Sequence, residues 1–129
     1  MYTTIATKKC LLGGEQFSCH AYTMIVEYIR YTVADRARGE ELQRAYVIAA
    51  TQLDAAPECL AYELTQCEED AKSWTLRIEW SSTEAHLQSF RKGPHFPAFL
   101  EAIRRFVPEI AEMRHYRLTG VQARKPARP

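Results

Sequence analysis

The sequence lacks the features that would mark a membrane, secreted or nucleic-acid-binding protein. None of its apolar runs approaches the roughly 20 residues that a helix needs to cross a bilayer. Its first residues lack the charged, apolar and small-residue order of a secretory signal. The 17 basic and 16 acidic side chains leave a net charge of +1, which favours neither nucleic acid nor a membrane as a partner. We therefore expect a cytoplasmic protein, and its 129 residues fit a single domain.

Cysteines and histidines are few and scattered. Cys10, Cys19, Cys59 and Cys67 form neither a CxxC pair nor a zinc-knuckle spacing, so we expect reduced thiols. The 4 histidines show no HxH or HExxH spacing. The Gly13-Gly14 pair lacks the pattern of a phosphate-binding loop. The sequence therefore predicts no metal site and no flavin, nucleotide or other cofactor.

The periodicity of the apolar residues predicts strands and helices in the order βαββαβ. Strands are predicted at 24–33, 59–67, 73–81 and 110–119, with helices from Asp35 to before Pro57, from a Ser81–Glu84 capping box to Gly93, and over 96–107. The clearest alternation places Trp74, Leu76, Ile78 and Trp80 on one face of a strand. This order is the split βαβ arrangement of the ferredoxin-like fold, an α+β class with a four-stranded antiparallel sheet.

We expect a domain with an extension at each end and one open sheet face. The predicted boundaries are an N-terminal extension at 1–22, the domain at 23–120 and a basic, proline-containing tail at 121–129. Helices on one face of the sheet leave the other face uncovered. We expect Ile25, Ile29 and Tyr31 on that open face, and a face-to-face homodimer that covers them.

The stretch LRIEWSSTEAHLQSFRKGPHFPAFL at 76–100 resembles the signature of the antibiotic biosynthesis monooxygenase family. Trp80 matches the tryptophan that ends the third strand in that family, and His95 with Phe96 matches its His-Phe step. The segments EYIRYTV and EMRHY are similar to the family's first and last strands. The resemblance covers roughly 24–119 and implies a dimeric α/β barrel with a pocket between sheet and helices in each subunit.

One position departs from the family pattern. Many relatives have a histidine five residues before the His-Phe histidine, and the heme-degrading branch uses it to bind iron, but this chain has Phe90 there. Phenylalanine cannot ligate heme iron, so heme degradation is only a minor alternative.

Several aromatic and histidine side chains are candidates for the lining of this pocket. The candidate bases are His95 and His86, and the candidate substrate-binding residues are Trp80, Tyr28, Tyr62, Phe90 and His115. Core packing or solvent exposure is the competing explanation for each of them. Strand parity leaves open which side His115 faces, and we interpret Glu27 with Arg30 as a cross-strand or dimer-face charge pair.

The leading hypothesis is a cofactor-independent monooxygenase that acts with dioxygen on a small phenolic, quinol-like or polycyclic aromatic compound. Such a reaction needs a base, hydrogen-bond donors for the developing oxyanion and a dry pocket. The alternative from another class is a non-catalytic dimer that binds or senses a small hydrophobic molecule in the same pocket.

Overall fold

The computed structural model describes residues 24–127, and the predicted extension at 1–22 lies outside this range, as do Cys10 and Cys19. Within it, Cys59 and Cys67 are free thiols, as expected. No helix of this part of the chain has the length and apolar character needed to span a membrane.

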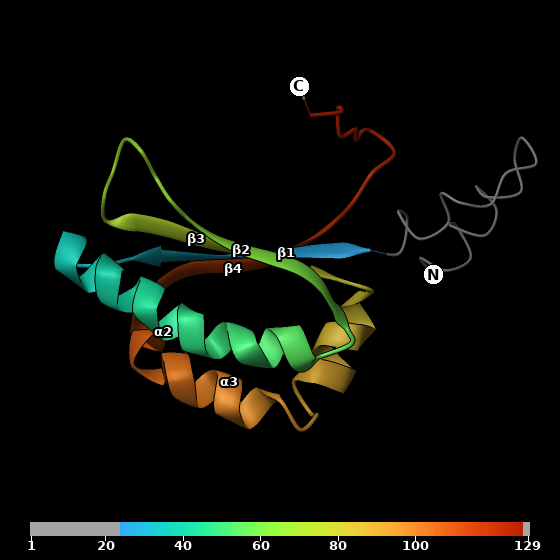
Figure 1. The fold of residues 1–129 in the computed structure, drawn as a ribbon, viewed down its shortest axis with the longest axis horizontal. Helices are drawn as coiled ribbons and strands as arrows, with labels where there is room; N and C mark the ends of the chain where they lie inside the picture. The colour runs from blue at the N-terminus through green and yellow to red at the C-terminus, as the bar shows by residue number, and fades with distance from the viewer. Residues whose placement is uncertain (1–23, 128–129) are drawn as a thin grey trace, which may run out of the picture.

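A single antiparallel sheet carries helices on one of its faces (Figure 1). The elements are β1 (Ile25–Thr32), α2 (Arg36–Ala55), β2 (Cys59–Gln66), β3 (Ser73–Trp80), the π-helix η3 (Ala85–Phe90), α3 (Phe96–Ile103), the 3₁₀-helix η4 (Arg104–Glu109) and β4 (Ile110–Arg117). The four strands lie in the order β2-β3-β1-β4. The predicted βαββαβ order and ferredoxin-like α+β fold are therefore confirmed.

The long helix α2 follows the predicted pattern. Asp35 caps it, since the backbone N–H of Arg38 donates to its carboxylate at 2.9 Å. Its apolar side chains at helical spacing, among them Leu42 and Leu53, are buried against the sheet. Gly39 lies against the indole of Trp74, where an added Cβ would stand 2.4 Å from the ring nitrogen. This close approach explains why a glycine occupies the middle of a helical turn.

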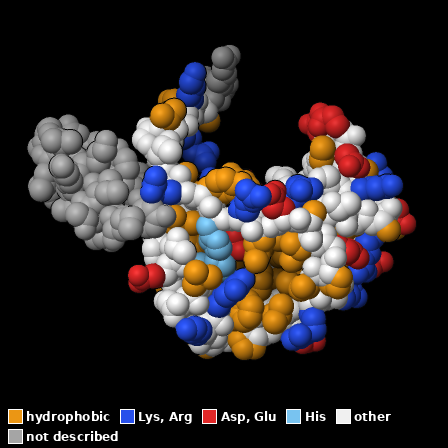
Figure 2. All heavy atoms as spheres, turned by 180° about the vertical axis from the view of Figure 1, so that it is seen from behind, with side chains coloured by type: hydrophobic (Ala, Val, Ile, Leu, Met, Phe, Trp, Pro, Cys, Tyr) orange, Lys and Arg blue, Asp and Glu red, His pale blue; other side chains and the backbone are white. Residues whose placement is uncertain are grey.

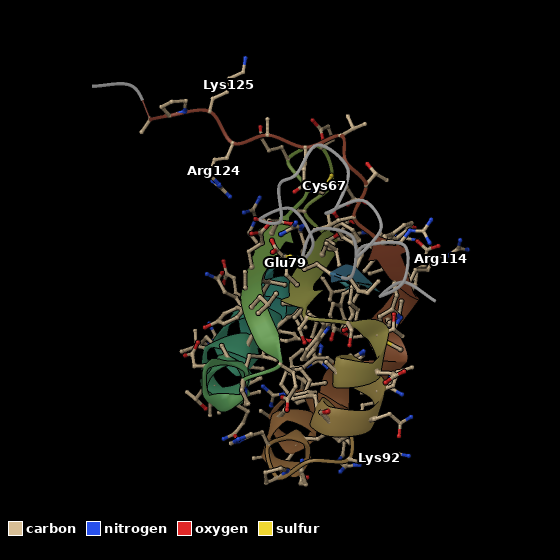
Figure 3. The ribbon with its side chains drawn as sticks, turned by 90° about the vertical axis from the view of Figure 1, so that its right-hand side faces the viewer. Cys67, Glu79, Lys92, Arg114, Arg124 and Lys125 are labelled. Carbon is tan, nitrogen blue, oxygen red and sulfur yellow. The ribbon has the colours of Figure 1, made fainter. Side chains whose placement is uncertain are left out.

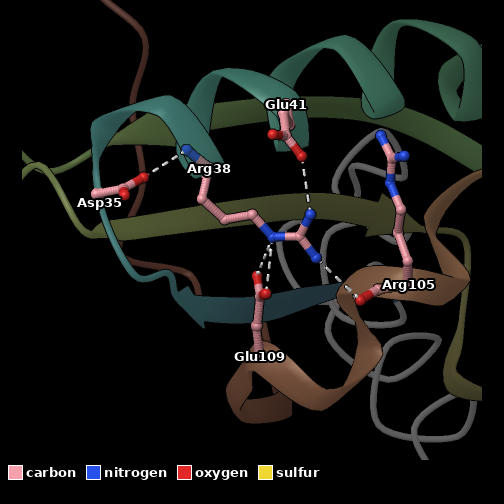
Figure 4. Close-up of polar contacts among 5 residues, drawn as sticks. All are labelled: Asp35, Arg38, Glu41, Arg105 and Glu109. Carbon is pink, nitrogen blue, oxygen red and sulfur yellow. Dashed lines mark hydrogen bonds and ion pairs between the residues drawn. The ribbon is translucent and has the colours of Figure 1, made fainter.

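Arg38 ties the start of α2 to η4 (Figure 4). Its Nε donates to Glu109 at 2.8 Å, and its other nitrogens donate to Glu41 at 2.9 Å and to the backbone carbonyl of Arg105 at 3.2 Å. The guanidinium also lies 4.1 Å above the centre of the Phe106 ring. Arg38 thus holds two helical segments together that are far apart in the sequence.

The short helix after β3 differs from the expected one. The hydroxyl of Ser82 accepts the N–H of Ala85 at 2.9 Å, so the cap lies one residue later than the predicted Ser81. The N–H of Arg91 bonds to the carbonyl of His86 at 3.0 Å, a spacing of five residues that defines a π turn. Both His86 and Phe90 of this helix are buried.

The prediction for the open sheet face was wrong, because it assigned the side chains of β1 to the opposite face of the sheet. Ile25, Ile29 and Tyr31 are buried on the side that faces the helices. The other face carries Tyr28, whose partners across the sheet are Arg77 and Arg114. A shift of one residue moves every side chain of a strand to the opposite face. The open face is therefore more polar than expected, and Arg77 forms an ion pair on it with Glu79 at 2.8 Å.

The segment after β4 has no helix or strand up to residue 127. It rises on the side of the sheet opposite the helices (Figure 1), where Arg124 and Lys125 line an open hollow together with Arg77 and Glu79 of β3 (Figure 3).

Candidate functional site

A cavity of about 180 Å³ lies between the helix-facing side of the sheet and the segments η3, α3 and η4. Most of its lining is apolar, including Ile29, Phe90 and Phe99. Val107 and Met113 also line it and are partly exposed, so they mark its mouth. Figure 2 shows histidine side chains at the surface beside a broad group of hydrophobic side chains. The cavity is suited to a small, mainly apolar ligand.

Among residues 24–127, Glu27 is the one carboxylate that lines the cavity. Its side chain faces the helices, and only 1% of the residue is exposed. The indole N–H of Trp80 donates to its Oε1 at 3.0 Å, and Nε2 of His86 lies 3.5 Å from the same oxygen. Burial raises the pKa of Glu27 to about 6, although the Trp80 hydrogen bond and the charge of Arg91 act in the opposite direction.

His86 and His115 lie against Glu27 and touch each other. Nδ1 of His86 lies 2.7 Å from Nε2 of His115, and that Nε2 lies 4.0 Å from Oε2 of Glu27. The imidazole of His86 stacks on Trp80, with ring centres 4.5 Å apart. Burial is the largest cause that lowers the pKa of His86 to about 3, and the neighbouring His115 and Arg91 act in the same direction. The pKa of His115 is also lowered, mainly by burial and then by Arg91. Both rings are therefore neutral near pH 7, and one nitrogen of the close pair donates to the other. We call Glu27, His86 and His115 the triad.

A pair of tyrosines supplies further polar atoms to the lining. The hydroxyls of Tyr31 and Tyr46 are hydrogen-bonded to each other, and both residues line the cavity. Burial raises the pKa of Tyr31 to about 12 and that of Tyr46 well above its usual value, so both remain protonated. Because one hydrogen bond between two hydroxyls uses only one proton, the pair retains a proton for a ligand.

Three of the predicted site residues line the cavity and a fourth adjoins it. Trp80, His86 and Phe90 are in the lining, and all three are buried. His115 reaches the site from β4 through its contact with His86, which settles the side of the sheet it faces. The segment from Trp80 to Phe90, which is part of the 76–100 stretch that resembles the family signature, therefore forms one wall.

The other three predicted residues lie elsewhere. Tyr28 is on the open face, with its ring against Tyr116. The hydroxyl of Tyr62 donates to Asp54 at 2.7 Å. His95 has Nδ1 at 3.3 Å from Oε1 of Gln52, and its side chain does not cap α3. The expectation that these three share one pocket with Trp80 is corrected: none of them is in the cavity lining.

The sequence interpretation missed Glu27 and Tyr46 as lining residues, and it placed Tyr31 on the open face. Glu27 was paired with Arg30, but Arg30 lies 3.8 Å from Glu112 on the open face. The available signal was that Glu27 alternates with Ile25 and Ile29, so it shares a buried face with apolar neighbours.

The triad also brings together three metal-ligating side chains that are dispersed in the sequence. One donor atom from each of Glu27, His86 and His115 lies within 4.8 Å of the other two. Local spacing could not predict this group, because its members come from β1, η3 and β4. The arrangement can accept or share protons at one side of an apolar cavity, and its donor atoms are of kinds that bind transition metals.

Comparison with known proteins gives a family and a fold. The family model for antibiotic biosynthesis monooxygenases matches residues 24–116. No curated protein matches the chain. A structure from Bordetella bronchiseptica, provisionally assigned as an antibiotic biosynthesis monooxygenase, has a TM-score of 0.61 at 21% identity, covering 75% of this chain and 98% of that one. SnoaB, a cofactor-independent oxygenase from Streptomyces nogalater, has a TM-score of 0.55 at 19% identity, covering 78% of this chain and 96% of that one.

Proposed function

The chain belongs to the antibiotic biosynthesis monooxygenase family, and we propose that it is a cofactor-independent monooxygenase for a small phenolic or quinol-like compound. The observation that carries the proposal is the triad at one side of an apolar cavity, with Glu27 and His86 in the lining and His115 in contact with His86. The triad places a carboxylate and two neutral imidazoles where a bound hydroxyl can lose its proton, while the apolar lining excludes water.

The substrate supplies the electrons in this reaction. Proton transfer from a quinol hydroxyl to the triad leaves an electron-rich anion that can reduce dioxygen and form a carbon–oxygen bond at the ring. Cleavage of the O–O bond and loss of the ring proton then release water. The overall reaction is balanced, because a quinol and dioxygen give a hydroxyquinone and water.

We assign three roles to side chains of the lining. The triad takes the proton, with His86 and Glu27 nearest the ligand. Trp80 forms a flat wall, and the Tyr31–Tyr46 pair donates a hydrogen bond to an oxygen of the substrate. The tyrosine pair takes the place of Tyr28 and Tyr62 in the sequence-based hypothesis.

The size of the cavity favours a single-ring substrate. A cavity of about 150 Å³ in another protein accommodates benzene. The cavity of about 180 Å³ in this protein therefore fits one ring with small substituents. A polycyclic compound would have to extend past Val107 and Met113 at the mouth.

We also propose that the protein is a homodimer that pairs through the open sheet face. This face carries the exposed aromatic rings of Tyr28 and Tyr116 among charged side chains such as Arg30 and Arg114. A partner subunit would bury these rings and pair the charges. Light scattering at micromolar concentration should give twice the mass of the chain, and a monomer mass would contradict the proposal.

Oxygen uptake tests the proposed activity. Protein freed of metal and flavin should consume oxygen with a panel of single-ring quinols, and His86→Gln should lose most of that rate. His95→Ala is the matched control and should retain it, because His95 does not line the cavity. No turnover above a heat-treated sample across quinols and anthrones would refute the proposal. Ligand-induced thermal stabilisation without oxygen uptake would instead support the non-catalytic binding protein.

A further inference from the structure

We propose that the triad is also a binding site for one divalent transition-metal ion, coordinated by Glu27, His86 and His115. Two imidazoles and one carboxylate form a common ligand set for zinc and for non-heme iron. Imidazole ligands favour zinc, iron, nickel or copper over magnesium and calcium, which prefer oxygen. The inference goes beyond the proposed oxygenase activity, which needs no metal.

The distances between the donor atoms suit a single ion. Two atoms that both bind one ion at about 2.1 Å can be at most about 4.2 Å apart. Nδ1 of His86 and Nε2 of His115 are 2.7 Å apart, and Nε2 of His115 is 4.0 Å from Oε2 of Glu27. All three donors lie within 4.8 Å of one another, which exceeds that limit, so side-chain rotations must draw them together to complete the site.

The surroundings orient the carboxylate for this role. The indole N–H of Trp80 donates to Oε1 of Glu27, which leaves Oε2 on the side of His115. Such outer hydrogen bonds commonly fix metal-ligating carboxylates. Because Glu27 and His86 line the cavity, the remaining coordination positions of the ion would face it. His115, whose side chain is 26% exposed, provides access from solvent.

Arg91 opposes the binding of a cation. It lines the same cavity, and its positive charge acts on all three members of the triad. A bound ion would also displace the proton shared by His86 and His115, so metal binding and proton transfer exclude each other. We therefore expect a tightly bound ion to inhibit oxygen uptake.

Cobalt(II) is the probe for this site, because its visible absorption reports its ligands. The chelator-treated full chain, titrated with cobalt(II), should show visible d–d bands that saturate at one equivalent. Glu27→Gln and His115→Ala should each weaken binding at least tenfold. Arg91→Gln should strengthen it several-fold, and His95→Ala should leave it unchanged. Circular dichroism would establish that each variant is folded, and His115→Ala removes a partly exposed side chain.

Three results would overturn the metal site. They are the absence of d–d bands, equal affinity in the wild type and His115→Ala, and a thiolate-to-cobalt charge-transfer band, which would place the ion on cysteine. The binding assay involves no turnover. A cobalt site in a protein that consumes no oxygen would therefore refute only the oxygenase proposal, and turnover without a cobalt site would refute only the metal site.

Discussion

Replacing Glu27 by glutamine should raise the stability of the protein and lower its activity. Glutamine has nearly the same size, and its amide oxygen can still accept the Trp80 hydrogen bond. The substitution removes only the charge of a carboxylate that is 1% exposed.

The pKa of Glu27 sets the size of the stability change. Burial raises this pKa from its ordinary value of 4.5 to about 6 in the folded chain. The folded state therefore holds the proton more tightly than the unfolded chain does, and the carboxylate destabilises the fold increasingly as the pH rises from 4.5 towards 6. At about 1.4 kcal/mol per pKa unit, the ionised Glu27 carboxylate lowers the free energy of unfolding by about 2 kcal/mol once the pH is above that interval.

Urea unfolding of metal-free protein measures this difference. At pH 8 the free energy of unfolding of Glu27→Gln should exceed that of the wild type by up to about 2 kcal/mol. At pH 4 the two should agree. Glu101→Gln is the control and should have little effect at either pH, since the Glu101 side chain is 75% exposed. A variant that is less stable than the wild type at pH 8 but equal at pH 4 would refute the reasoning. Oxygen uptake should fall about 10²- to 10⁴-fold in the same variant.

Three further substitutions test the packing around the site. Gly39→Ala should lower the free energy of unfolding by about 1–3 kcal/mol, because its Cβ would displace Trp74; an unchanged denaturation midpoint would contradict this close contact. Tyr46→Phe should lower the free energy of unfolding by about 1–2 kcal/mol, because it leaves the buried hydroxyl of Tyr31 without its partner. Replacing both tyrosines by phenylalanine should restore most of that stability, as measured by thermal unfolding. Arg38→Ala should lower the free energy of unfolding, measured by chemical denaturation, by about 1 kcal/mol at low salt and by less at high salt. A variant as stable as the wild type at low salt would contradict the role of the Arg38 ion pairs.

The sequence predicts the fold well because its periodicity is strong. The alternation of Trp74 to Trp80 and the helical spacing after Asp35 each mark an element whose bounds agree with β3 and α2 to within a residue or two. The segment that resembles the family signature contains Trp80, His86 and Phe90, which line one part of the cavity. These are local patterns, and local patterns are what a single sequence displays.

The rest of the site depends on contacts that no local pattern contains. Glu27 and His115 belong to strands at opposite ends of the sequence and meet because β1 pairs with β4. The burial of Tyr31, and the exposure of Tyr28, depend on strand parity, which the run of apolar residues on both sides of Glu27 obscured. The π-helix that carries His86 has no sequence signal of its own.

Oxygen-isotope labelling tests the central claim most directly. Metal-free protein should be supplied with a single-ring quinol under ¹⁸O₂, and the product analysed by mass spectrometry. If the protein is a monooxygenase of this kind, the hydroxyquinone carries one ¹⁸O atom and the other appears in water. A product without label, formed together with hydrogen peroxide, would contradict the account, because the protein would then act as an oxidase and insert no oxygen.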